Sequence, residues 1–446
     1  MFSLWAAVFL GTACTPACEG ATCSNLYPAG LLGRFDLAQR TPERDPRLPD
    51  IAWQGIASDG NAWAFAAIGD RVALGLPDAG AVRVDGVVAF TGDASSHFGA
   101  AIDAGADAEG RAEIVVGWPG ATGTLGQAHA GAVQGWQEGD DGAWGMVWEL
   151  RGTVPEGRLG SSVARCADLD ADGQPDVVVG ARWSGGAGLD GAAVLLLSGD
   201  GPLLGGIPAS QAHVRAGAAA GDQYGAALAC TGDVTGDAQD DLVVGAPGAG
   251  GGAGAVQVIA GGPGVAERDP WATWTGEADE DWLGASVALA DLDGDGVDDV
   301  VAGAPGADGV AGASDVTGAV FAWRGGAVAP TGPSLRVAGE AGRDRHGAAL
   351  AVADLDGDGA VDLAVGAPGH NPTGDAGDQG SGAAYVHWGP LLGESAPRQA
   401  ADAATRVEAA RGYLDTGGRM GVVTATDGTR AELVLRVRMP AAATGP

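Results

Sequence analysis

The chain has 446 residues, 81 of them glycine, and its 57 acidic and 24 basic side chains give a formal net charge of −33. Hydrophobic residues make up 46% of the chain, too many for a disordered polar segment, and the glycines follow no collagen period. A surface of this charge repels phosphate backbones, so we expect no nucleic-acid partner.

The chain begins with an apolar segment, residues 1–13, that is typical of a signal peptide. It is shorter than the roughly 20 apolar residues that a membrane helix needs, and we expect no transmembrane helix elsewhere. Gly11-Thr12-Ala13-Cys14 is similar to the cleavage site of bacterial lipoproteins, where the cysteine is acylated. A plain cleaved signal is the alternative. We therefore expect an exported protein, either an outer-membrane lipoprotein anchored at Cys14 or a periplasmic or extracellular protein, with a linker over residues 14–28.

Five cysteines are an odd number for an exported chain. If Cys14 carries a lipid, Cys18 and Cys23 can form one disulfide, and Cys166 and Cys230 a second. The last two stand at near-equivalent places in successive repeats. The alternative is that they are small buried apolar residues.

One unit recurs along the chain after residue 51. A complete copy has an apolar or aromatic residue followed by glycine, then an acidic loop, then a valine-rich run that ends in Gly-Ala-Pro or a variant. Such copies begin at Leu159, Tyr224, Leu283 and His346. A weaker copy begins at Phe98, and two more, at Arg71–Pro77 and Met420–Val437, lack the acidic loop.

Each unit contains alternating or continuous apolar runs that predict four short strands. The fold class we expect is all-β: a seven-bladed β-propeller of four-stranded blades over residues 29–437, followed by a tail over 438–446. Residues 31–37 and 51–54 are strand-like and belong to no unit. We expect them to pair with residues 420–426 and 432–437, so that strands from both ends complete the last blade and close the ring. Closure removes exposed sheet edges.

The acidic loops have the pattern Asp-x-Asp-x-Asp-Gly-x-x-Asp. Side chains at positions 1, 3, 5 and 9 and the carbonyl at position 7 can surround one hard cation with oxygen, which suits Ca²⁺ better than Mg²⁺. The alternative is an acidic turn that binds nothing. The predicted ligands are Asp168, Asp170, Asp172, Gln174 and Asp176; Asp233, Thr235, Asp237, Gln239 and Asp241; Asp291, Asp293, Asp295, Val297 and Asp299; and Asp354, Asp356, Asp358, Ala360 and Asp362.

These loops are not equivalent. Three are complete, whereas the loop that begins at Asp233 has Thr235 at position 3 and Ala238 at position 6. Alanine there costs about 1–2 kcal/mol if the turn needs a left-handed residue. A fifth loop, from Gly105 to Glu113, retains Asp107, Glu109 and Glu113 but has no ligand at position 1, so we expect it to bind weakly or not at all.

The Phe-Gly and Gly-Ala-Pro landmarks around an acidic loop resemble the FG-GAP repeats of the integrin α-subunit propeller, which also occur in exported bacterial proteins. The resemblance covers roughly residues 51–437. No inserted ligand-binding domain and no Arg-Gly-Asp tripeptide are present. The resemblance implies that partners use the face opposite the acidic loops, and it points there to Trp118, Arg182, Trp183, Trp282 and the Pro368–Gly382 turn. The alternative is that these tryptophans pack between blades.

No catalytic motif of a metalloprotease, an α/β-hydrolase or a P-loop enzyme occurs, and we expect no enzyme. His97 and His346 fall at the Phe-Gly landmark, where packing is the expected role. The leading hypothesis is an exported calcium-binding propeller that recognises a protein or glycan ligand at the cell surface, as in adhesion. The alternatives are a structural envelope protein without a specific ligand and, after that, an enzyme with an unrecognised site.

Overall fold

The structure is a computed structural model. It describes residues 31–35, 54–57, 64–68, 71–85, 87–106, 110–182, 191–196, 205–206, 212–308, 316–340, 342–355, 358–370, 383–392, 398–399, 405–408, 420–424 and 431–437. The predicted signal segment, linker and tail lie outside these ranges. So do Cys14, Cys18, Cys23, Asp107, Glu109, Trp183, Asp356 and most of the Pro368–Gly382 turn.

The described residues form β-strands and three single turns of 3₁₀-helix, η3 (Ala94–Ser96), η5 (Ala249–Gly251) and η6 (Val265–Glu267), with no α-helix among them. The all-β prediction is therefore confirmed. Within the described part of the chain, no helical segment has the length and apolarity that crossing a bilayer requires.

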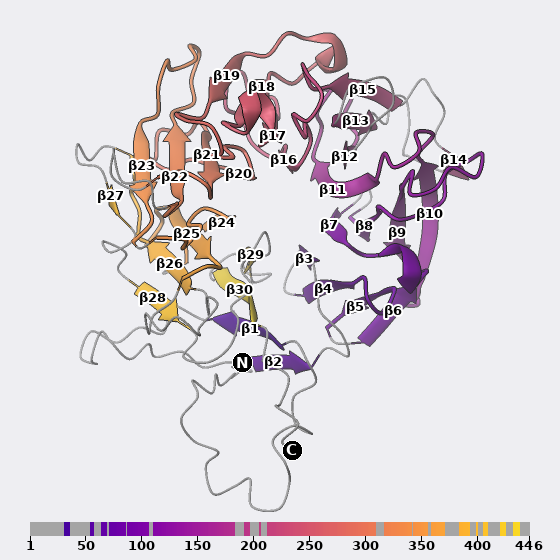
Figure 1. The fold of residues 1–446 in the computed structure, drawn as a ribbon. Helices are drawn as coiled ribbons and strands as arrows, with labels where there is room; N and C mark the ends of the chain where they lie inside the picture. The colour runs from indigo at the N-terminus through magenta and orange to yellow at the C-terminus, as the bar shows by residue number, and fades with distance from the viewer. Residues whose placement is uncertain are drawn as a thin grey trace, which may run out of the picture.

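The strands are arranged in seven sheets, which Figure 1 shows one after another around a common centre. The first is β3 (Ala64–Ile68), β4 (Arg71–Leu76), β5 (Ala81–Val84) and β6 (Val87–Thr91). The second is β7 (Ala101–Ala106), β8 (Ala112–Trp118), β9 (Ala132–Glu138) and β10 (Trp144–Arg151), and the third is β11 (Leu159–Cys166), β12 (Asp176–Ala181), β13 (Ala192–Leu196) and β15 (Ala212–Ala216). The fourth is β16 (Ala227–Ala229), β17 (Leu242–Ala246), β18 (Ala255–Ile259) and β19 (Ala272–Thr275).

The fifth sheet is β20 (Ser286–Ala290), β21 (Asp299–Ala304), β22 (Ala319–Trp323) and β23 (Leu335–Ala338), and the sixth is β24 (Ala349–Ala353), β25 (Asp362–Ala367), β26 (Ala383–His387) and β28 (Thr405–Glu408). Within these sheets, successive strands pair antiparallel, as expected for four-stranded meanders. Two sheets differ from the prediction by a short fifth strand. β14 (Gly205–Gly206) adds parallel to β10, and β27 (Arg398–Gln399) adds parallel to β23.

The remaining sheet combines strands from distant parts of the chain, in the order β2 (Gln54–Ala57), β1 (Leu31–Phe35), β30 (Ala431–Val437) and β29 (Met420–Thr424). β1 pairs antiparallel with β30, with Leu31 opposite Val437 and Phe35 opposite Leu433. One end strand of each sheet contacts the corresponding end strand of the next sheet, in the order β3, β7, β11, β16, β20, β24, β29 and again β3. We call these the first strands of the sheets.

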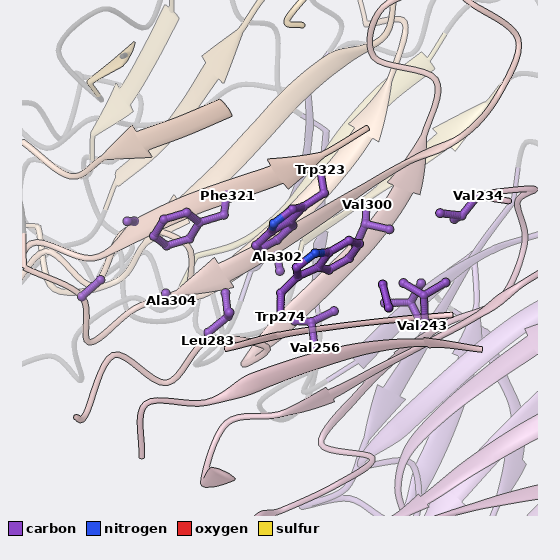
Figure 2. Packing of buried hydrophobic residues seen from close by; sticks show 14 residues of the cluster. Val234, Val243, Val256, Trp274, Leu283, Val300, Ala302, Ala304, Phe321 and Trp323 are labelled. Atoms are coloured by element: carbon purple, nitrogen blue, oxygen red, sulfur yellow. The ribbon is translucent and has the colours of Figure 1, made fainter. Parts of the chain in front are cut away.

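The core consists of layers between neighbouring sheets, because the second strands are buried on both faces. All six residues of β21 are buried. Val300, Ala302 and Ala304 pack against residues of the fourth sheet. Trp274 of the fourth sheet stacks on Trp323 of the fifth, with ring centroids 4.6 Å apart (Figure 2). Fully burying a large apolar side chain stabilises a fold by about 1.5–3 kcal/mol, so each layer binds one sheet firmly to the next.

The glycines of the two landmarks meet between sheets. Gly284, which follows the landmark residue Leu283, has φ +86° and donates its N–H to the carbonyl of Gly303 in its own sheet. Its own carbonyl oxygen lies where a Cβ on Gly245 of the preceding sheet would stand. The same contact joins Gly99 with Gly75, Gly160 with Gly117, Gly225 with Gly180, and Gly347 with Gly303. The repeat therefore has glycine at both landmarks because two backbones touch there.

A disulfide joins Cys166, the last residue of β11, to Cys230, which follows β16. Both cysteines are buried. Of the two alternatives left open by the sequence, the structure therefore has the covalent link. It connects the third and fourth sheets across a sequence separation of 64 residues.

Candidate metal centre

The acidic loops connect the first and second strands of the third to sixth sheets. Position 2 of each loop is a buried apolar residue: Leu169, Val234, Leu292 or Leu355. Its backbone amide donates to Oδ2 of the aspartate at position 9, at 2.8, 2.8, 2.9 and 2.7 Å respectively. The position 9 carboxylate therefore holds the start of the loop against its end.

The carboxylate at position 1 organises the turn. Oδ1 of Asp291 accepts from the amides of Gly294 and Asp295 at 2.7 and 3.1 Å, and Oδ2 accepts from Gly296 at 2.8 Å. Asp168, Asp233 and Asp354 accept from amides at equivalent places. The loops therefore have one common backbone conformation.

That conformation requires two left-handed residues, at positions 4 and 6. Glycine occupies both in the loop that begins at Asp291, with φ of 79° and 88° at Gly294 and Gly296. Ala238 at position 6 has φ 67°, so the turn does need a left-handed residue there, and alanine bears the conformational cost of about 1–2 kcal/mol. Ala171 at position 4 also has a positive φ, 64°, which the motif did not indicate because its glycine stands only at position 6.

Among the described residues, two loops bring three carboxylates together. Carboxylate oxygens of Asp168, Asp170 and Asp176 lie within 4.8 Å of one another, and so do those of Asp291, Asp293 and Asp299. The position 5 aspartates do not belong to these groups, and instead accept from the amide at position 7, as Asp295 does from Val297 at 2.9 Å. The loop with Thr235 has no such group among its described residues.

The electrostatics of these groups favour a cation. Burial, with a smaller contribution from the charges of Asp293 and Asp295, raises the pKa of Asp299 to about 6. Burial and the neighbouring Asp172 and Asp168 likewise raise the pKa of Asp170. Arg324 lies 3.2 Å from Oδ2 of Asp293, but its guanidinium is half exposed.

The donor set fits a hard divalent cation. Oδ1 of Asp170 is buried and has no hydrogen-bond partner among the described residues, and the same holds for Oγ1 of Thr235, which occupies position 3 of the next loop. Two equivalent oxygens therefore have no hydrogen-bond partner in the part of the chain that the structure describes. Carboxylate, hydroxyl and carbonyl oxygens are the ligands that Ca²⁺ takes.

The fifth loop differs from the prediction in register. The residue opposite position 9 precedes position 1 by one residue in the fifth sheet, where Ala290 pairs with Asp299, and by two in the third, where Cys166 pairs with Asp176. Gly105 pairs with Glu113 in the second sheet, so Glu113 stands at the place of position 9, and Gly105 precedes position 1 instead of occupying it.

At the opposite end of the strands, the residues expected in recognition have different roles. Trp118 packs edge-on against Phe98, donates to Oγ of Ser96 at 2.7 Å and lies under the guanidinium of Arg151, so the packing alternative holds for it. The guanidinium of Arg182 donates to Oε1 of Gln223 at 2.8 and 2.6 Å. Trp282 is 39% exposed and remains available.

The residues directly before the landmarks are a feature that the sequence analysis missed. His97, Arg158, Gln223, Trp282 and Arg345 all have left-handed φ, from 52° to 62°. His346 is buried, as expected of a packing residue, whereas His97 is exposed, which corrects its expected role. No propensity signal marks these positions, because they are occupied by five ordinary side chains of four types.

Comparison with known proteins agrees with the repeat. The family model of the FG-GAP repeat matches residues 225–259, 283–323 and 346–387. Integrin alpha-PS2 of Drosophila melanogaster is 33% identical over 182 residues, 39% of this chain but only 12% of the fly protein. A solved structure described as the Dos1 propeller aligns with a TM-score of 0.44 and 12% identity, over 86% of this chain and 76% of that one. Three segments of the chain thus match the FG-GAP repeat, and part of the chain is similar to part of an integrin α chain.

Proposed function

We propose that this protein is an exported, calcium-binding β-propeller that recognises a protein or glycan ligand at the cell surface through the face opposite its acidic loops. Binding, and not catalysis, is the role we assign to it. The observation that carries the proposal is the set of left-handed residues before the landmarks.

A left-handed conformation costs a non-glycine residue about 1–2 kcal/mol, and strained backbone of this kind gathers at functional sites. Five of the described sheets have such a residue at the same place, and none of the five is glycine. The side chains are His97, Arg158, Gln223, Trp282 and Arg345. Arginine and tryptophan are frequent anchors of recognition surfaces.

The positions share one face because of the strand order. Each of these residues lies one to four positions before a first strand, whereas the acidic loops follow the first strands. Backbone hydrogen bonds to the preceding sheet hold the turns, as from Trp282 to the carbonyl of Gly252 at 2.9 Å and from Arg158 to that of His129 at 3.0 Å. The five side chains therefore lie on a rigid surface around the contacting first strands.

A closed seven-bladed ring is part of the proposal. It is supported by the cyclic contacts of the first strands and by the pairing of β1 with β30. Closure would leave none of the seven sheets at an open end. Deleting residues 29–56 should lower the melting temperature sharply and promote aggregation, and unchanged melting would contradict a closed ring.

Calcium is the proposed cofactor. It is supported by the buried oxygens of Asp170 and Thr235, which no described residue meets with a hydrogen bond. When bound, the ion would neutralise carboxylates that burial holds together. The ligands would come from positions 1, 3, 5 and 9 and the position 7 carbonyl of the loops that begin at Asp168, Asp233, Asp291 and Asp354. The most complete described groups belong to the first and third of these.

Export is proposed from the segment before Cys14 and from the similarity to an extracellular receptor chain. A lipid anchor at Cys14 is the finer form of this proposal. The intact mass of the protein from its native host should then correspond to a chain that begins at Cys14 and carries an acylated diacylglycerol adduct. A mature chain that begins at any other residue would contradict the lipid anchor at Cys14.

Ligand recognition is tested by measuring binding of the full chain to a glycan array and to purified cell-surface proteins of the organism that produces it. Arg158→Ala combined with Trp282→Ala should abolish saturable binding without a change in melting temperature. Val214→Ala, at a 66% exposed position of the outermost strand β15, is the matched control and should bind normally. Equal binding by the double variant would overturn the proposed face.

A further inference from the structure

Arg165 is the one cation at its repeat position. It stands six residues after the landmark residue Leu159, near the end of β11. The equivalent residues of the second, fourth, fifth and sixth sheets are Ala104, Cys230, Leu289 and Val352. The sheet that precedes Arg165 is the second, which contains the degenerate loop. At this repeat position, a positive charge therefore stands only beside the degenerate loop. The Arg324 side chain near Asp293 of the fifth sheet comes from another position and is 48% exposed.

The guanidinium of Arg165 is directed into that loop. Nε donates to Oε2 of Glu113 at 2.7 Å, and the two side chains are only 8% and 12% exposed. Nη1 lies 2.6 Å from the place where a Cβ on Gly105 would stand, so the arginine covers the residue that pairs with Glu113. The backbone amide of Arg165 donates to Oδ2 of Asp103 at 2.8 Å.

Glu113 occupies the place that position 9 has in the other loops, opposite the residue that precedes position 1. In the loop that begins at Asp291, the position 9 carboxylate lies against two further carboxylates. Here its two oxygens instead accept from Arg165 and from Nε1 of Trp148, the latter at 3.2 Å. A buried side chain of the neighbouring sheet thus supplies the positive charge that Glu113 faces.

We propose that Arg165 is a built-in cation that replaces the divalent ion in the second sheet, so that this loop and its contact with the third sheet are independent of calcium. The proposal rests on the proposed calcium sites of the other loops. An arginine charge is permanent at physiological pH and cannot be removed by a chelator. Sheets two and three would therefore remain associated under conditions that loosen sheets three to six.

The effect of removing the charge of Arg165 should depend strongly on whether Glu113 keeps its own charge. A buried carboxylate whose partner is removed is left uncompensated, whereas removal of both charges is often tolerated. Arg165→Gln should therefore open the second sheet, and Arg165→Gln combined with Glu113→Gln should restore it. The pair Arg151–Glu149, whose side chains are 31% and 25% exposed, is the matched control in which both steps should have little effect.

The test is amide hydrogen exchange of the full chain, with calcium and with chelator. Chelation should speed exchange at least tenfold in β20–β21 and leave β7–β8 unchanged. In Arg165→Gln, β7–β8 should exchange at least tenfold faster under both conditions, and the double variant should return close to the wild-type rate. Calcium-dependent exchange in wild-type β7–β8, or no effect of Arg165→Gln there, would overturn the proposal.

The two proposals fail in different ways. If chelation changes exchange in none of the loops and calorimetry detects no calcium binding, the calcium sites are wrong, and the replacement of an ion by Arg165 is wrong with them. If β20–β21 respond to calcium but Arg165→Gln and the double variant with Glu113→Gln show no coupling between the two residues, only the role of Arg165 is wrong.

Discussion

The carbonyl oxygen of Gly284 fills the space in which a side chain on Gly245 would begin. Gly284 lies two residues before β20, the first strand of the fifth sheet, and Gly245 lies in β17 of the fourth. The contact recurs between neighbouring sheets, so the landmark glycines set how closely the sheets approach one another.

Gly245→Ala should therefore destabilise the fold by at least about 2 kcal/mol, because the atom it meets is backbone and cannot rotate away. Chemical denaturation measures the change. Gly332→Ala is the matched control: no atom lies within 4 Å of its added Cβ, and its stability should change by less than about 1 kcal/mol. Equal stability of the two variants would contradict the contact.

Asp299 should be required for one calcium site. It is 2% exposed and lies with Asp291 and Asp293. Asp299→Asn should reduce the calcium stoichiometry by one in titration calorimetry. It should also remove about 2.7 kcal/mol of calcium-dependent stabilisation at a hundredfold excess over the dissociation constant. The exposed Asp279→Asn should change neither. Identical melting of the wild type with calcium and with chelator would show that the loops are only turns.

Acid should destabilise the sixth sheet through His346. This residue is fully buried, neither ring nitrogen has a hydrogen-bond partner among the described residues, and its ring packs 5.1 Å from that of Tyr385. Burial, and then the charges of His387 and His370, lower the pKa of His346 well below its usual value.

Because the folded pKa is depressed, the unfolded chain binds the proton first as the pH falls below about 6.5. Stability should then decrease by up to about 1.4 kcal/mol per pH unit. His346→Phe, the aromatic residue of the landmark, should remove this part of the pH dependence, measured by denaturation at pH 7.5 and 5.5.

The disulfide between Cys166 and Cys230 should stabilise the fold by about 4 kcal/mol, since it closes a loop of 64 residues in the unfolded chain. Replacing both cysteines with alanine should lower the free energy of unfolding by about that amount, and a reductant should have the same effect on the wild type during unfolding. If a reductant leaves the unfolding curve of the wild type unchanged and labelling finds two free thiols, the link is absent.

Local patterns made much of this fold predictable. The all-β class, the antiparallel units and the bounds of the acidic loops follow from residues close together in sequence. For example, the loop from Asp291 to Asp299 is closed by a hydrogen bond from the amide of Leu292 to the carboxylate of Asp299. The need for a left-handed residue at position 6 was equally visible, because glycine or alanine there is a local choice.

What the sequence could not determine depends on which sheets are neighbours and on backbone angles that no residue type signals. Arg165 reaches Glu113 across 52 positions, and no motif links the two residues. Trp282 and Arg158 have left-handed φ that their residue types do not signal, and their amides donate to carbonyls of the preceding sheet. Cys166 and Cys230 could pair or merely pack, and only the approach of the third and fourth sheets decides for the disulfide. Tertiary contact overrides local preference at these positions because the stabilising partner lies on another sheet.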